Sequence, residues 1–149
     1  MTRSRTIARP RKEVWAVLAD FGGLAAWADN ADHTCLLHAP DGDPIGIGTE
    51  RRVQAGRMTL VERVTTSEAP EVLAYAIEGL PPVVKAVTNE WRLTPEGDSS
   101  TVVALTSTID CGPRPPQQLV ARIVGLRLAK ASDTMLSGLA ATLEEAPHA

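Results

Sequence analysis

Apolar and polar residues alternate with the period of a β-strand over much of the chain from about residue 48 to residue 110. Successive side chains of a strand point to opposite faces, so this alternation predicts a sheet with one buried face. Gly56, Pro70 and Gly97 are residue types that favour turns, and each lies between two such runs. We therefore expect an antiparallel sheet of six or seven strands, over about 2–9, 33–38, 48–55, 58–67, 71–78, 83–94 and 101–110.

Helical spacing of apolar residues appears near the two ends of the chain. After Pro10, which suits a first helical position, Val14, Leu18 and Phe21 share one helix face. A second short helix is expected over 24–28, and a long one of about 43 Å over 116–144. The packing face of the long helix is a stripe with steps of three or four residues: Val120, Val124, Leu128, Ala131, Met135 and Leu139.

This order of elements predicts an α+β fold in one domain over residues 1–149, since the length suits a single core. A curved antiparallel sheet closed by one long terminal helix leaves a hollow between sheet and helix. A hollow lined by apolar side chains is typical of a small-molecule site.

Composition excludes several classes of function. The net charge of −3 argues against a nucleic-acid partner. No apolar run reaches the ~20 residues that span a bilayer, and no signal peptide is evident, so we expect a cytoplasmic protein without integral membrane association. No metal is expected, because His33 and Cys35 supply two ligands where a structural zinc site needs four. No cofactor is expected either, because Gly46 and Gly48 precede no helical pattern.

Two surfaces leave alternatives open. The N-terminal stretch is basic, which fits either a solvated strand and helix start or contact with an anion or a membrane surface. Leu119, Ile123 and Leu126 form a second apolar face on the first turns of the long helix. That face indicates a helix start buried on two sides, the mouth of a cavity, or a dimer contact. A monomer or a homodimer is consistent with this pattern.

Several short segments, in order and spacing, resemble the START-like (SRPBCC) superfamily, particularly its bacterial polyketide cyclase/dehydrase branch. The segments are Ala-Arg-Pro at 8–10, Val-Trp-Ala-Val-Leu-Ala-Asp-Phe at 14–21, Trp27, Gly-Ile-Gly-Thr-Glu-Arg at 46–51, Val-Glu-Arg-Val at 61–64, Leu-Ala-Tyr at 73–75 and Thr-Pro-Glu-Gly-Asp at 94–98. The resemblance covers nearly the whole chain. It implies the helix-grip fold, a curved antiparallel sheet of six or seven strands wrapped around one long C-terminal helix, with one or two short helices after the first strand. It implies no single activity, because this fold hosts carriers, receptors, cyclases and regulators.

The resemblance also implies which side chains face the interior. In related ligand receptors the Glu of a Glu-Arg-aliphatic segment faces the cavity, which places Glu62 inside. The period of two then brings Leu60 and Val64 to the same face, and Trp27 and Asn30 are expected near the entrance. The expected cavity is lined by Trp27, Asn30, Leu60, Glu62, Val64, Tyr75, Ile77, Val103, Leu105, Ser107, Val124 and Leu128.

The polar members of this set admit two roles. Closing a polyketide ring needs a base and an acid or oxyanion donor, which Glu62 and Tyr75 could supply as catalytic residues. Glu62 could instead pair on the surface with Arg63, Arg92 or another arginine of a neighbouring strand.

Our leading hypothesis is a carrier or sensor that binds a hydrophobic small molecule, lipid-like or polyketide-like. A cavity built mostly from aliphatic side chains binds by burial, which favours this role over catalysis. The first alternative is a polyketide cyclase/aromatase or dehydratase that acts in the same cavity. The second is a partner-binding module that uses the face formed by Leu119, Ile123 and Leu126.

Overall fold

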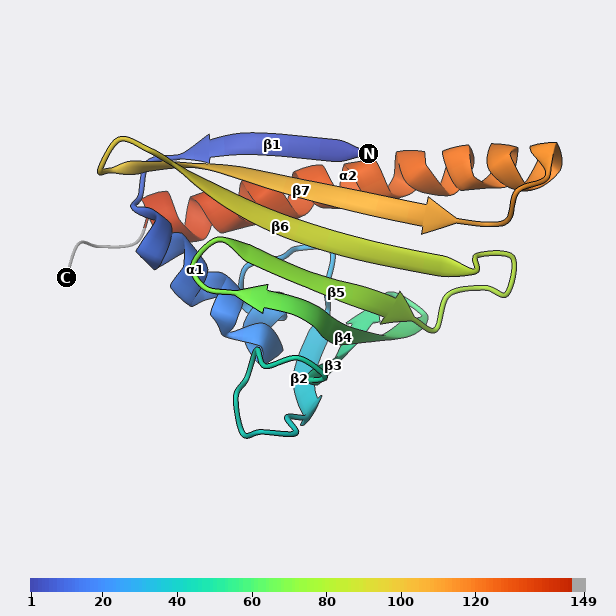
Figure 1. The fold of residues 1–149 in the computed structure, drawn as a ribbon, viewed down its shortest axis with the longest axis horizontal. Helices are drawn as coiled ribbons and strands as arrows, with labels where there is room; N and C mark the ends of the chain where they lie inside the picture. The colour runs from blue at the N-terminus through green and yellow to red at the C-terminus, as the bar shows by residue number, and fades with distance from the viewer. Residues whose placement is uncertain (146–149) are drawn as a thin grey trace.

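A computed structural model describes residues 1–145 and contains one seven-stranded antiparallel sheet beside a long C-terminal helix (Figure 1). Residues 146–149, the end of the predicted single domain, lie outside the described part. The strand order across the sheet is β1-β7-β6-β5-β4-β3-β2. The elements are β1 (Thr2–Ile7), α1 (Arg11–Ala19), the 3₁₀-helix η1 (Phe21–Ala26), β2 (His33–His38), β3 (Glu50–Ala55), β4 (Met58–Glu68), β5 (Val72–Glu78), β6 (Ala86–Glu96), β7 (Ser100–Asp110) and α2 (Pro115–Glu144).

The observed elements follow the predicted ones closely, apart from shifts of one or two residues at the ends of β1, β3, β4, β5 and α2 and from the following three differences. The second short helix is a 3₁₀-helix over 21–26 and not a helix over 24–28. Strand β6 begins at Ala86, because residues 79–85 form a connection in which Pro81 and Pro82 have no N–H to donate to a ladder. Strand β6 also continues through Pro95, so the turn before β7 is shorter than predicted and has Gly97 at a φ of 69°.

One face of the sheet is buried under helices. Burial alternates along β7, where Thr101, Val103, Leu105 and Ser107 are buried and the residues between them are partly exposed. Helix α1 and η1 lie under one end of this face and contribute buried side chains to a single apolar core. These side chains are Val14, Trp15, Leu18, Phe21 and Leu24.

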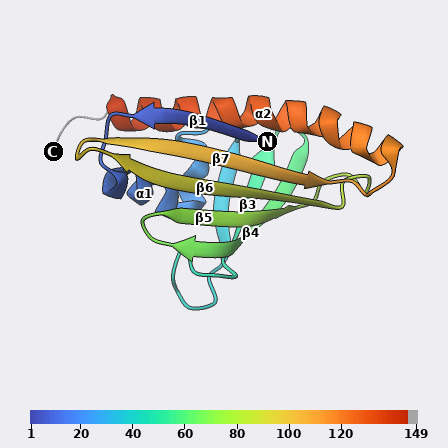
Figure 2. The ribbon, with the colours of Figure 1, turned by 45° about the horizontal axis from the view of Figure 1, so that its top comes forward.

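Helix α2 packs most tightly through its C-terminal half, although Gly125 and Ala129 in its N-terminal half are also buried. Pro115 and Pro116 start it, and the Gln117 side chain accepts a hydrogen bond of 3.0 Å from the Arg114 N–H. In the C-terminal half, Gly138 lies so close to the Trp27 backbone that a Cβ would collide with the Trp27 carbonyl oxygen. The first turns of α2 project past the ends of β7 and β6, as Figures 1 and 2 show from two directions.

The predicted stripe on α2 divides at the same place. Met135 and Leu139 are buried in the core. Val120, Val124, Leu128 and Ala131 are only partly buried. The prediction of a curved antiparallel sheet gripping a long helix is confirmed. The N-terminal half of α2 lies at the end of the sheet beyond which the helix projects, and we call this end the open end of the grip. The connection 79–85 lies at this end too (Figure 1).

Candidate functional site

A row of polar side chains crosses the buried face of the sheet from β3 to β7. Its members are Arg51 on β3, Glu62 on β4, Tyr75 on β5, Asn89 on β6 and Ser107 on β7. All five are at most 5% exposed. Strand register explains the row, because Arg51 is the direct partner of Glu62, Tyr75 of Asn89, and Asn89 of Ser107. Five neighbouring polar residues on a largely apolar face form a candidate site.

Arg51 and Glu62 form a buried ion pair. The Arg51 Nε donates to Glu62 Oε1 at 2.7 Å, and a terminal guanidinium nitrogen lies 2.6 Å from the same oxygen. The other terminal nitrogen donates to the Phe21 carbonyl oxygen at 3.0 Å. The guanidinium also stacks 3.8 Å from the Phe21 ring centre and 4.7 Å from that of Tyr75. The charge of Glu62 is thus neutralised inside the protein. The alternative of a surface pair is wrong about the location, because β3 turns its arginine inward, but it is right that the partner can be an arginine of a neighbouring strand.

The Tyr75 hydroxyl oxygen accepts two hydrogen bonds in this row. Trp91 Nε1 donates to it at 3.2 Å, and Asn89 Nδ2 lies at the long distance of 3.5 Å. Asn89 Oδ1 in turn accepts a bond of 2.7 Å from Ser107 Oγ. Both lone pairs of the Tyr75 oxygen are therefore used, and its own proton remains available to donate.

Burial raises the pKa of Tyr75 above its ordinary value of 10.0, and the negative charge of Glu62 adds to the rise. The positive charge of Arg51 and the hydrogen bonds from Trp91 and Asn89 act in the opposite direction but do not cancel it. The phenol consequently stays protonated at neutral pH. It can serve as a hydrogen-bond donor to an oxygen atom.

Four of the chain's five aromatic residues meet at this place. Phe21 packs edge-on against Tyr75 with 5.7 Å between ring centres, and Trp27 packs edge-on against Trp91 at 6.0 Å. Trp27 is 7% exposed, and its buried indole N–H has no hydrogen-bond partner among the described residues. An unpaired buried donor is costly, so this N–H is a candidate contact for an acceptor that the chain itself does not supply.

The residues predicted to line a cavity divide into two groups. Val64, Tyr75, Val103, Leu105 and Ser107 are buried, and Val103 and Leu105 have no accessible surface at all. No water-sized space therefore lies beside these two side chains in this structure. Leu60, Ile77, Val124 and Leu128 are partly buried, and Asn30 is exposed.

Sequence reasoning placed Glu62, Tyr75 and Ser107 on the inner face, and it missed Arg51 and Trp91 as their partners. The position of the Gly56 turn is enough to identify Arg51 as the partner of Glu62. Ala55 pairs with Met58 around that turn, and counting four residues outward along both strands pairs Arg51 with Glu62. Trp91 faces inward by the same alternation that buries Asn89 and Leu93.

Three pockets lie around this buried core. One of about 230 Å³ opens under the connection 79–85 and is lined by Ile77, Leu80, Val84 and Val87 among others. A second of about 340 Å³ lies between the end of β7 and α2, beside Ile109, Arg122 and Gly125. The first two therefore flank the open end of the grip.

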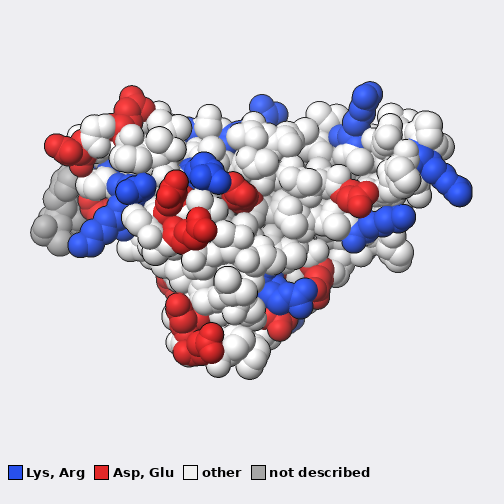
Figure 3. All heavy atoms as spheres, in the orientation of Figure 1, with Lys and Arg blue, Asp and Glu red and all other residues white. Residues whose placement is uncertain are grey.

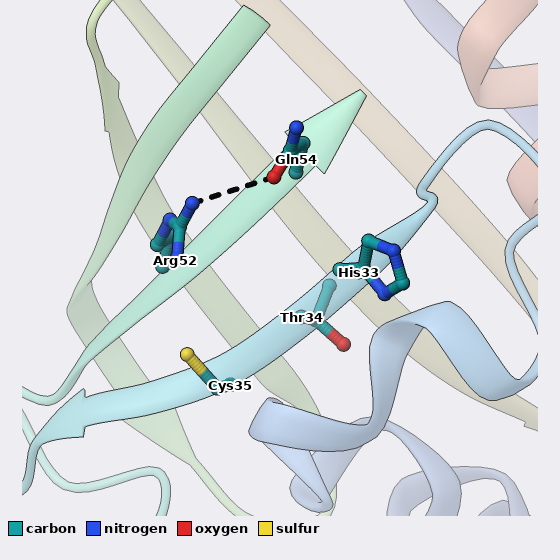
Figure 4. A pocket seen from close by; sticks show the side chains of 5 residues that line it. All are labelled: His33, Thr34, Cys35, Arg52 and Gln54. Carbon is teal, nitrogen blue, oxygen red and sulfur yellow. Dashed lines mark hydrogen bonds between the residues drawn. The ribbon is translucent and has the colours of Figure 1, made fainter. Parts of the chain in front are cut away.

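The third pocket is a shallow hollow of about 90 Å³ on the outer face of β2 and β3 (Figure 4). His33 and Cys35 share this face, as their spacing predicted, and the side chains of Arg52 and Gln54 hydrogen-bond to each other opposite them. Within residues 1–145, no three His, Cys, Asp or Glu side chains gather in a way that could hold a metal ion.

No helix in residues 1–145 is long and apolar enough to cross a membrane.

Several solved structures are similar in fold. The aromatase/cyclase ZhuI from Streptomyces sp. R1128 superposes with a TM-score of 0.79 at 21% identity, over 97% of this chain and 92% of that one. The di-domain aromatase/cyclase BexL from the BE-7585A biosynthetic pathway gives 0.79 at 15% identity, over 97% and 46%. A START superfamily protein from Mycobacterium smegmatis gives 0.67 at 14% identity, over 93% and 95%. At these identities the likeness shows the fold alone.

Comparison with curated proteins gave no significant match. The family model described as polyketide cyclase / dehydrase and lipid transport matches residues 1–144, nearly the whole chain. The START-like resemblance drawn from the short motifs is thereby confirmed, and the chain belongs to the polyketide cyclase/dehydrase and lipid transport family.

Proposed function

We propose that this protein binds a hydrophobic small molecule, lipid-like or polyketide-like, on the inner face of its sheet at the open end of the grip. One observation carries the proposal: at the same end of the molecule, large aliphatic side chains of the sheet and of the helix are only partly buried. On the sheet, burial decreases from Val64 to Leu60 and from Tyr75 to Ile77. Family membership and the fold of the aromatase/cyclases support a ligand of this class.

On the helix, burial decreases in the same direction, from Met135 and Leu139 in the core to Leu128 and Val124. The sheet thus offers partly exposed aliphatic surface in the pocket under the connection 79–85, and α2 lines the other pocket at this end, beside Ile109, with Arg122 and Gly125. Covering such surface releases roughly 25 cal/mol per Å² of apolar area, so a ligand of modest size gains substantial affinity there.

The polar row would orient the ligand. The protonated Tyr75 hydroxyl and the unpaired Trp27 N–H are donors, which suit a ligand with a carbonyl or hydroxyl oxygen. Arg51 and Glu62 neutralise each other, so the site favours a neutral ligand over a strongly charged one. Because Val103 and Leu105 are tightly packed, access to these donors requires the N-terminal half of α2 or the connection 79–85 to move outward.

Binding of prodan, an uncharged fluorescent hydrophobic probe that carries a ketone oxygen, tests the site. Ile77→Lys places a charge at the open end on a partly exposed position and should weaken binding of the probe at least tenfold. Thr88→Lys adds the same charge on the exposed outer face of β6 and should leave binding unchanged. Equal binding by the two variants would place the probe elsewhere and contradict the proposal. If only Ile77→Lys weakens binding, native mass spectrometry of protein from its own host would identify the natural ligand by mass.

A cyclase or dehydratase reaction in the same place is a second candidate, favoured by the protonated Tyr75 hydroxyl near Glu62. Glu62, from its ion pair with Arg51, would take a proton from the carbon beside one ketone; that carbon would bond to the carbon of a second ketone, whose oxygen would take the proton of Tyr75 as its C=O double bond becomes single. Turnover of a polyketone substrate that falls about 10²-fold or more in Tyr75→Phe, with binding retained, would support this role. Binding without turnover in the unaltered protein would leave the carrier or sensor role.

A further inference from the structure

The first half of α2 has a second apolar stripe on the side away from the core. Leu119, Ile123 and Leu126 are spaced by four and three residues, so they lie along one face of the helix. They are 59%, 52% and 67% exposed, which is unusual for three large aliphatic side chains in one row. The stripe is a convex ridge, since these turns project beyond the ends of the strands (Figures 1 and 2).

The charges around this stripe have one sign. Between Arg114 and Lys130 the helix start carries four cationic side chains and no acidic one, although the whole chain has a net charge of −3. At 100° per residue, Arg122 lies on one side of the stripe and Arg127 on the other, with Lys130 at its C-terminal end. Figure 3 shows basic side chains prevailing at the end of the molecule where α2 begins, while acidic ones gather elsewhere.

We infer that this stripe docks on the surface of an anionic lipid bilayer. A convex apolar ridge flanked by cations is the pattern of a helix that lies in the membrane interface, with aliphatic side chains among the acyl chains and cations at the headgroup phosphates. A protein groove would cover the ridge equally well, but the absence of acidic side chains along 114–130 favours a uniformly negative partner. The inference goes beyond the proposed ligand site and does not depend on it. Docking would bring the open end of the grip to the bilayer.

Sedimentation of the full chain with lipid vesicles tests this inference. Vesicles of phosphatidylglycerol and phosphatidylcholine in equal parts should carry the protein down, vesicles of phosphatidylcholine alone should not, and added salt should release it. Ile123→Ser should weaken binding about tenfold, because it removes one buried aliphatic side chain. Arg127→Gln should weaken it about fivefold, as expected for one cation at an anionic surface.

Two matched variants control for general effects on the surface. Leu37→Ser removes an aliphatic side chain that is 51% exposed on β2, and Arg57→Gln removes an exposed cation from the β3–β4 turn. Both should bind the anionic vesicles like the unaltered protein. An Ile123→Trp variant should show a blue shift of its fluorescence on binding, which reports burial of that position in lipid.

Three results would overturn the inference. The unaltered protein could fail to bind the anionic vesicles, or it could bind them equally well after Ile123→Ser. Light scattering could also show that the unaltered protein is a dimer which Ile123→Ser converts to a monomer, and the stripe would then be a contact between two copies of the chain.

Discussion

Removal of the charge of Glu62 should strongly destabilise the protein. In Glu62→Gln the side chain keeps its shape and an oxygen acceptor, but the guanidinium of Arg51 loses its counter-charge. The side chains of Arg51 and Glu62 are 4% and 7% exposed, so water cannot replace the lost charge. Breaking a buried ion pair from one side typically costs about 3–5 kcal/mol. We expect that loss in the free energy of unfolding measured by urea denaturation at neutral pH.

A matched control lies on the opposite face of the sheet, between β4 and β5. Arg63 and Glu78 are 2.8 Å apart, nearly as close as the buried pair, but their side chains are 47% and 53% exposed. Glu78→Gln should therefore cost less than about 1 kcal/mol. In a chain of this size each kcal/mol lowers the melting temperature by about 2–4 °C, so the two variants should be clearly separated by thermal denaturation as well.

The double variant Arg51→Leu with Glu62→Leu separates charge from packing. Replacing a buried ion pair by apolar side chains is often neutral or stabilising, so this variant should be more stable than Glu62→Gln alone. If Glu62→Gln instead unfolds within about 1 kcal/mol of the unaltered protein, Arg51 reaches water or another anion, and the description of this pair as buried and mutually neutralised is wrong.

Further predictions concern α2 and Tyr75. Gly138→Ala should cost about 1–3 kcal/mol in urea denaturation, because its Cβ would meet the Trp27 backbone. Gly125→Ala should be neutral or stabilising by up to about 1 kcal/mol, since its Cβ would meet only flexible side-chain ends and alanine favours the helix; equal effects of the two substitutions would contradict the described packing of α2. The absorbance of tyrosinate, which only Tyr75 can contribute, should appear at higher pH in the folded protein than in free tyrosine, and a normal titration would place the hydroxyl in water. Folded protein then holds this proton more tightly than unfolded protein. The contribution of Tyr75 to the free energy of unfolding is therefore complete below about pH 10 and is lost as pH rises through the raised pKa. Tyr75→Phe should remove this pH dependence.

Sequence patterns predicted the fold well because the local signals agree with one another. The strand predicted over 33–38 has the observed bounds of β2, and the helix predicted over 116–144 matches α2 to within one residue at its start. Where two local signals disagree, the observed strand begins at a different residue from the predicted one. Val83 continues an apolar run, but the prolines before it keep it out of β6.

The candidate site was predictable only in part. Period-two alternation identifies Glu62, Tyr75 and Ser107 as inward-facing, but it does not give the partner of a charged side chain. That partner depends on register between strands, which the Gly56 turn determines for Arg51. The size of a cavity depends on how closely α2 approaches the sheet. That distance is set by contacts such as Gly138 with Trp27, which no pattern along the chain reveals.

The most direct test of ligand binding on the inner face uses the three tryptophan indole N–H signals in a proton–nitrogen NMR spectrum, assigned by single Trp→Phe substitutions. The Trp27 N–H is unpaired, the Trp91 N–H donates to the Tyr75 oxygen, and Trp15 is a buried residue of α1. On titration with prodan, we expect the Trp27 signal to shift most, the Trp91 signal to follow, and the Trp15 signal to stay in place. A probe that binds while the signals of Trp27 and Trp91 remain unchanged would contradict a ligand site on the inner face of the sheet.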